Sequence, residues 1–391
     1  MTTNETGDLA AARSAAIEAS GWGAPFHLVQ LRNACFWVFA FGMAAGTLQL
    51  VHFYVPGVGA YGAGLTIGVI AFGLYTVPWL LLLSYHNRYT SLPPKLLFVA
   101  FAWAFVASTY WMAVQANGAV LSLYGKLFGP GWARDWGPGL TAPFTEEAAK
   151  ATALVLLLGL APRLVRSPYD GLIIGAFAGL GFQISEDVSY AFNAAANGFG
   201  ADQVASAWGI FAARAGAGLF QHVLFSAVFC SGLMWLLGRG GTRHRGRGLL
   251  LMLGAMVVHS GWDNFSAYGL SIAGVLGIPL MMLLLAVGGL LLLWTAFRLA
   301  APQEQAWLYA ILAPEAERGL LTDAEVRAVS GGWKTRRAYH RSIHGHRERR
   351  SADHTLAAAH DLAQELARCG GRDTPAVDHA RGEVERLRGR P

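Results

Sequence analysis

Residues 143–163 read PFTEEAAKATALVLLLGLAPR, a segment with the length and apolar character of a membrane-spanning helix. About 20 residues are needed for a helix to cross the roughly 30 Å hydrocarbon core of a bilayer. Glu146, Glu147 and Lys150 interrupt the segment, although a charged side chain at the centre of such a helix costs roughly 2.5–3.5 kcal/mol. The segment therefore predicts a spanning helix whose charges face protein or water instead of lipid.

Similar apolar segments occupy most of the first 300 residues. They lie at about 33–54, 63–85, 95–117, 143–163, 171–193, 209–237, 248–268 and 271–299. The chain is 54% hydrophobic and 14% charged, whereas an average soluble domain has about 25% charged residues. The sequence therefore predicts an all-α, multi-pass protein of the cell membrane with about eight transmembrane helices, embedded in the lipid bilayer.

Basic residues gather in alternate loops between these segments. They are Arg88 and Lys95, then Arg163 and Arg166, then Arg239, Arg243, Arg245 and Arg247. The positive-inside rule then predicts that both termini are cytoplasmic and that the segment around 118–142 lies outside. The expected divisions are a cytoplasmic segment 1–32, a transmembrane domain 33–300, and a mixed-charge helical tail 301–391 in the cytoplasm. Because that tail holds nearly as many acids as bases, no nucleic-acid partner is expected.

Three further segments also carry ionisable residues, namely Glu186 and Asp187, Arg214 and His222, and His259 and Asp263. A rise of ~1.5 Å per residue places five of the side chains roughly 17–25 Å from the cytoplasmic ends of their helices: Glu146, Glu186, His222, His259 and Asp263. Polar groups at one depth on four helices indicate a single site. Lys150 and Arg214 are expected mainly to compensate charge, because so many carboxylates cannot ionise together without cations or shared protons.

Three motifs follow in order, each on its own segment: E-E-x-x-K at 146–150, F-x-x-x-E at 182–186 and H-x-x-x-D at 259–263. With Arg214 and His222 between the last two, the set resembles the PrsW family of intramembrane proteases, relatives of the type II CAAX-processing (Abi) proteases. The resemblance covers about 143–268. It implies an endopeptidase that cuts membrane-anchored protein substrates near the extracytoplasmic face, including site-1 cleavage of the anti-sigma-factor type.

The resemblance also implies which side chains form the site. The catalytic set is Glu146, Glu147, Lys150, Glu186, His222, His259 and Asp263, supported by Phe182 and Arg214. Two forms of the chemistry stay open. In a metal form, Glu186, His222 and His259 ligate Zn²⁺, a carboxylate-plus-histidine set typical of catalytic zinc. In a metal-free form, a glutamate works beside His259 and Asp263. The excess of carboxylates over fixed cations slightly favours a metal.

The adjacent glutamates compete for the role of base. Neighbouring residues on a helix point about 100° apart, so one of them faces the histidines and the other is free to pair with Lys150. Spacing does not choose between Glu146 and Glu147, whereas the resemblance favours Glu146.

Two other classes of protein use similar residues. A proton- or cation-coupled transporter also buries Glu, Asp and His in its spans, but signs of inverted repeats are weak here. A non-catalytic scaffold has no need for both carboxylates and histidines, so the intact motifs favour the enzyme.

Overall fold

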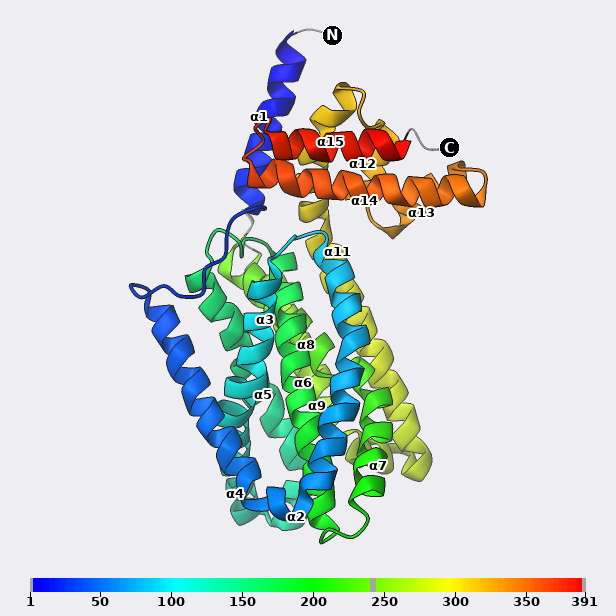
Figure 1. The fold of residues 1–391 in the computed structure, drawn as a ribbon. Coiled ribbons are helices and arrows are strands. Elements are labelled where there is room, and N and C mark those ends of the chain that lie inside the picture. Colours follow the sequence, from blue (N-terminus) through cyan, green and yellow to red (C-terminus); the bar gives the residue numbers. More distant parts are fainter. Residues whose placement is uncertain (1–2, 240–243, 389–391) are drawn as a thin grey trace.

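The computed structural model describes residues 3–239 and 244–388, which form a tall helix bundle with a smaller helical cap at one end (Figure 1). These two ranges contain helices and no strand, which confirms the all-α class. Arg243, one of the loop arginines used to orient the chain, lies outside the described residues.

The first two expected spans belong to one helix that folds back on itself. Helix α2 (Ala34–Asn87) contains Pro56 and leaves helical geometry at Tyr61, where φ is −121°. Its two arms meet at the end of the bundle remote from the cap (Figure 1). Each arm corresponds to one of the expected segments, 33–54 and 63–85.

The third span and the expected outer segment 118–142 form a continuous series of helices. The span consists of α3 (Pro94–Trp103), a π-helical stretch η1 (Ala104–Ala113) and α4 (Val114–Phe128). The segment 118–142 is divided between α4 and the beginning of α5 (Pro130–Leu160). Gly129 makes the sharp turn between them at φ +91°, a conformation that glycine adopts without a steric penalty.

Helix α6 (Pro168–Asn197) runs through the centre of the bundle and is buried along most of its length. It packs closely against α8 (His222–Leu237) because glycines face the neighbouring backbone. A Cβ added at Gly175 or Gly179 would lie 2.2 Å from Ser226 O or 2.3 Å from His222 O. These glycines therefore serve helix packing, as small residues commonly do between membrane helices.

The sixth expected span, 209–237, is a broken helix, which corrects the expectation of one continuous span and places Arg214 and His222 on different helices. It divides into α7 (Gln203–Ala217), a 3-10 turn η2 (Gly218–Phe220) and α8. The interruption frees carbonyl groups that two other helices satisfy. Gln183 Nε2 donates to Gly218 O at 3.1 Å, and Tyr75 Oη donates to Ala215 O at 3.0 Å. Non-helical backbone inside a membrane bundle is tolerated where protein groups satisfy it in this way.

The remaining helices complete the bundle and build the cap. They are α9 (Arg245–Asp263), α10 (Phe265–Ala273), η3 (Gly274–Leu276), α11 (Gly277–Glu317), α12 (Asp323–Ser330), α13 (Trp333–Ser342), α14 (His346–Arg368) and α15 (Pro375–Arg388). Helix α11 continues from the bundle into the cap, so the expected boundary at 300/301 falls inside a helix.

The cap has its own hydrophobic core, formed by the end of α11, α12, α14 and α15 together with the N-terminal helix α1 (Thr3–Ser20). Buried Glu315 of α11 links other helices of the cap. It accepts hydrogen bonds from Arg13 Nη2 at 2.7 Å and Arg381 Nε at 2.9 Å. Helices α1 and α15 are thus joined in one body.

Four stretches of the described chain are long and apolar enough to cross a membrane, judged by length and composition. They are α2, the run from α3 to α4, α6, and the run from α10 to α11. Since α2 contains two arms and α8 is a shorter apolar helix, this result fits a multi-pass bundle. The count of eight spans stays a prediction.

Candidate active site

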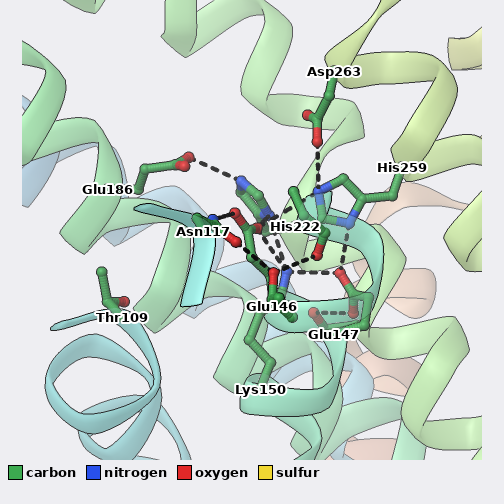
Figure 2. A network of polar contacts seen from close by, with 12 residues as sticks. Thr109, Asn117, Glu146, Glu147, Lys150, Glu186, His222, His259 and Asp263 are labelled. Atoms are coloured by element: carbon green, nitrogen blue, oxygen red, sulfur yellow. Dashed lines mark hydrogen bonds and ion pairs between the residues drawn. The ribbon is translucent and has the colours of Figure 1, made fainter. Parts of the chain in front are cut away.

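Helices α5 to α9 bring the expected site residues together inside the bundle (Figure 2). Helix α6 starts beside the end of α2, where Tyr169 Oη donates to His86 O. The adjoining Tyr89 in turn donates to Gly331 O of the cap. Glu186 lies roughly 27 Å further along α6 at ~1.5 Å per residue. The site therefore lies in the half of the bundle remote from the cap.

Glu146 is the point on which two histidines converge. Its Oε2 atom lies 3.7 Å from His222 Nδ1 and 3.6 Å from His259 Nε2. The two imidazole ring centroids are 5.3 Å apart. The three residues come from α5, α8 and α9, and all of them are buried. One ligand atom from each lies within 4.8 Å of the others, so this group could hold a metal ion.

Glu147, the neighbour of Glu146 on α5, points in a different direction from Glu146 and belongs to a buried polar cluster. Its Oε1 atom is 2.7 Å from Lys150 Nζ and 3.0 Å from His259 Nδ1, and its Oε2 accepts a hydrogen bond from Ser226 Oγ at 3.0 Å. Lys150 is farther from Glu146, at 3.8 Å. The structure thus separates the adjacent glutamates: Glu147 is the closer partner of Lys150, and Glu146 is the carboxylate that both histidine rings approach.

Glu186 lies beside His222 and shares the cation Arg214 with the adjacent Asp187. Arg214 Nη2 donates to Glu186 Oε2 at 2.6 Å, and its Nε donates to Asp187. Glu186 Oε2 also lies 3.0 Å from His222 Nε2. Arg214 therefore compensates two carboxylates, and Glu186 orients one ring of the histidine pair.

Phe182, one turn before Glu186 on α6, forms an aromatic wall of the site. Its ring centroid is 5.1 Å from that of His222, and Lys150 Nζ lies 4.6 Å from it. This placement gives the Phe of the F-x-x-x-E motif a packing role against the catalytic candidates.

Two further polar residues lie near the histidines and Glu146, and the sequence predicted only the first of them. Asp263 follows His259 by one turn, and its Oδ2 lies 3.4 Å from His259 Nε2. Asn117 was not expected. Its Nδ2 donates to Glu146 Oε1 at 3.0 Å, while Thr145 Oγ1 donates to Asn117 Oδ1 at 2.5 Å. An amide at the end of an otherwise apolar segment was the one available signal.

A cavity of about 370 Å³ opens beside these groups. Its polar lining includes Glu146, Glu186, His222 and Asp263, but not Glu147, and Trp262 adds an apolar wall. A polypeptide entering this cavity would therefore reach Glu146 first among the adjacent glutamates.

The donor atoms around Glu146 fit a metal ion. Glu146 Oε2 and His259 Nε2 are buried and have no hydrogen-bond partner within the described ranges. Each histidine also has a carboxylate at its other nitrogen, Glu147 for His259 and Glu186 for His222, an arrangement common at metal-binding histidines. His222 Nδ1 is 3.0 Å from Lys150 Nζ, so binding through that atom requires the ammonium to move.

The group that could hold an ion differs in one member from the set expected from the sequence. Glu146 takes the position assigned to Glu186, because Glu186 lies on the far side of the His222 ring and is held by Arg214.

A multi-pass helix bundle with buried carboxylates and histidines around a cavity has the architecture of an intramembrane protease. The family model of the PrsW family intramembrane metalloprotease matches residues 92–289, half of the chain, and the chain belongs to this family. The match includes every expected site residue and confirms the resemblance drawn from the three motifs. No curated protein and no solved structure matches the chain.

Proposed function

We propose that this protease hydrolyses peptide bonds of membrane-anchored proteins in the cavity beside Glu146. The observation that supports this proposal is the convergence of His222 and His259 on one carboxylate that lines the cavity. Amide hydrolysis needs an activated water, stabilisation of the developing oxyanion and a proton donor for the leaving amine. The carboxylates and imidazoles that meet beside the cavity supply these three functions.

Glu146, His222 and His259 would hold the metal ion that the family description implies. A bound divalent ion, Zn²⁺ being our expectation, supplies Lewis acidity and lowers the pKa of water. Glu147 and Glu186 orient the two imidazoles from behind. Asn117 positions the Glu146 carboxylate through its amide.

Asp263 is our candidate for proton acceptor when Glu146 acts as a ligand. It lines the cavity and forms no ion pair with Lys or Arg in the described chain, whereas Glu186 is paired with Arg214. In a metal-free form Glu146 itself takes the proton, as the family resemblance suggested. Both forms require Glu146.

The proposed substrates are proteins anchored in the same membrane, and anti-sigma factors are one such class. The depth of Glu186 along α6 supports cleavage near the face remote from the cap, which is the extracytoplasmic face if the cap is cytoplasmic.

Replacement of Glu146 by Gln tests the proposal because it keeps the side-chain shape and removes the charge. Membranes from cells that make the full-length protein would be compared by mass spectrometry of protein N-termini. New N-termini within or beside spanning segments should accompany the wild type. They should decrease about 100- to 10,000-fold with Glu146→Gln. The control Glu317→Gln changes an exposed residue of the cap and should behave as wild type. Equal cleavage by Glu146→Gln and wild type would refute the proposal.

A further inference from the structure

Two adjoining hollows lie where the cap meets the bundle, away from the catalytic cavity. One, of about 840 Å³, lies between the loop after α1, the loop before α3, and α14. The other, of about 640 Å³, runs along the first turns of α3. Phe26, Pro94 and Lys95 line both hollows, so the two form one continuous groove.

The first hollow is basic. Arg88, Lys95 and Arg368 line it, and its lining includes no Asp or Glu. The Arg88 guanidinium lies over the rings of Tyr85 and Tyr89, and its Nη2 donates to Tyr89 Oη at 2.8 Å. Its Nε and Nη1 atoms are buried and have no hydrogen-bond partner in the part of the chain that the structure describes.

Two features reduce the positive charge of this hollow without cancelling it. Arg368 pairs with Glu365 one turn earlier on α14. Burial lowers the pKa of His360, another lining residue, so its ring is neutral near pH 7. Arg88 and Lys95 then supply most of the field, and Lys95 is exposed.

The second hollow is mostly apolar, although His27 and Lys95 also line it. It is lined by Phe26, Leu28 and Val29 on the chain before α2, and by Phe98 and Val99 on α3. Val29 and Phe98 are each 68% exposed. Large apolar side chains with such exposure are expected where hydrocarbon, and not water, surrounds the protein.

We propose that this groove binds one anionic phospholipid of the surrounding membrane, with its phosphate at Arg88 and Lys95 and an acyl chain against Phe98. A basic hollow joined to an apolar channel at the boundary of a membrane bundle matches a molecule with an anionic head and a hydrocarbon tail. The lining comes from both bodies, Lys95 from the bundle and Arg368 from the cap. The lipid would therefore lie at the junction of the cap and the bundle, beside the contact of His360 Nε2 with Arg88 O at 2.7 Å.

Native mass spectrometry of the full-length protein in detergent tests this site. Dioleoyl phosphatidylglycerol, dioleoyl phosphatidylcholine and glycerol 3-phosphate would be titrated separately. We expect one phosphatidylglycerol to be retained in preference to the other two compounds. Lys95→Gln should weaken its retention roughly fivefold, the effect expected for one basic group at a membrane surface, and Phe98→Ala should weaken it as well.

Matched variants at the opposite end of the bundle serve as controls. Lys126→Gln removes an exposed lysine of α4, and Leu127→Ala trims a neighbouring side chain that is 63% exposed. Both should retain the lipid as the wild type does. The proposal is overturned if the two phospholipids are retained equally, if Lys95→Gln matches Lys126→Gln, or if Phe98→Ala matches Leu127→Ala. Glycerol 3-phosphate binding as strongly as the lipid would indicate a soluble phosphate site instead.

Discussion

At the scale of single residues, helical geometry gives two adjacent glutamates different surroundings. Because consecutive side chains diverge by about 100°, Glu146 lines the cavity while Glu147 lies among Lys150, Ser226 and His259. We therefore assign Glu146 to the reaction and Glu147 to the support of its neighbours.

Glu147→Gln should destabilise the protein more than Glu146→Gln does. The substitution removes the closest carboxylate of fully buried Lys150, and breaking a buried ion pair costs about 3–5 kcal/mol. Adding Lys150→Met should restore much of the loss, because the uncompensated charge disappears. Thermal unfolding in detergent measures all four proteins, and equal midpoints for the two single variants would contradict the assignment.

Asp263→Asn should separate proton transfer from ion binding. If Asp263 is the proton acceptor, the variant keeps its metal content but cleaves about 100- to 10,000-fold more slowly. The measurement is cleavage by the purified variant beside its elemental analysis. A variant as fast as the wild type would remove Asp263 from the proposed mechanism.

The sequence predicted most of this site and missed the groups that have no charge. The helix rise, counted from the cytoplasmic ends of the segments, placed His222, His259 and three carboxylates at one depth, and the structure brings them close together. Asn117 and Ser226 act through hydrogen bonds between helices far apart in the chain. Uncharged polar residues cost little in a spanning segment, so Ser226 had no mark in its local sequence, and Asn117 had only its amide at the end of an apolar segment.

At the scale of helices, the break between α7 and α8 places His222 at the start of a helix beside the cavity. The apolar segment 209–237 predicted one continuous span here. The reason for the difference is long-range, because the freed carbonyls are satisfied by Gln183 of α6 and Tyr75 of α2. In contrast, the two arms of α2 were predicted, since the apolar segments 33–54 and 63–85 are each long enough to cross the bilayer.

Gln183→Leu should destabilise the break. It leaves Gly218 O without its donor in a buried setting, which costs about 1–3 kcal/mol. Gln115→Leu, at an exposed position of α4, is the matched control and should change stability by less than about 0.5 kcal/mol. Unfolding of both variants in detergent measures the difference, and indistinguishable midpoints would show that Gln183 does not hold the break.

At the scale of the whole molecule, the described chain consists of a catalytic bundle and a cap that contains the N-terminal helix α1 and the C-terminal helix α15. None of the residues assigned to the reaction lies in the cap. The sequence predicted a charged helical tail but not its core, because that core depends on α1 packing against α11 across almost the entire chain.

The orientation of the molecule is a prediction from its loop arginines. Reporter fusions after residue 391 and within the loop between α6 and α7, residues 198–202, should report opposite sides, with the C-terminus in the cytoplasm. The structure places that loop at the end of the bundle remote from the cap (Figure 1). Both reporters on one side would invalidate the common depth of the site residues.

Elemental analysis of purified, cleavage-competent protein is the most direct test of the assigned ligand set. We predict a stoichiometric divalent ion in the wild type and its loss in Glu146→Gln, because Glu146 is the carboxylate shared by His222 and His259. Glu186→Gln should keep the ion, though more weakly, since Glu186 only orients His222. Two results would contradict the assignment. One is an active wild type that contains no ion. The other is an ion that Glu146→Gln keeps and Glu186→Gln loses.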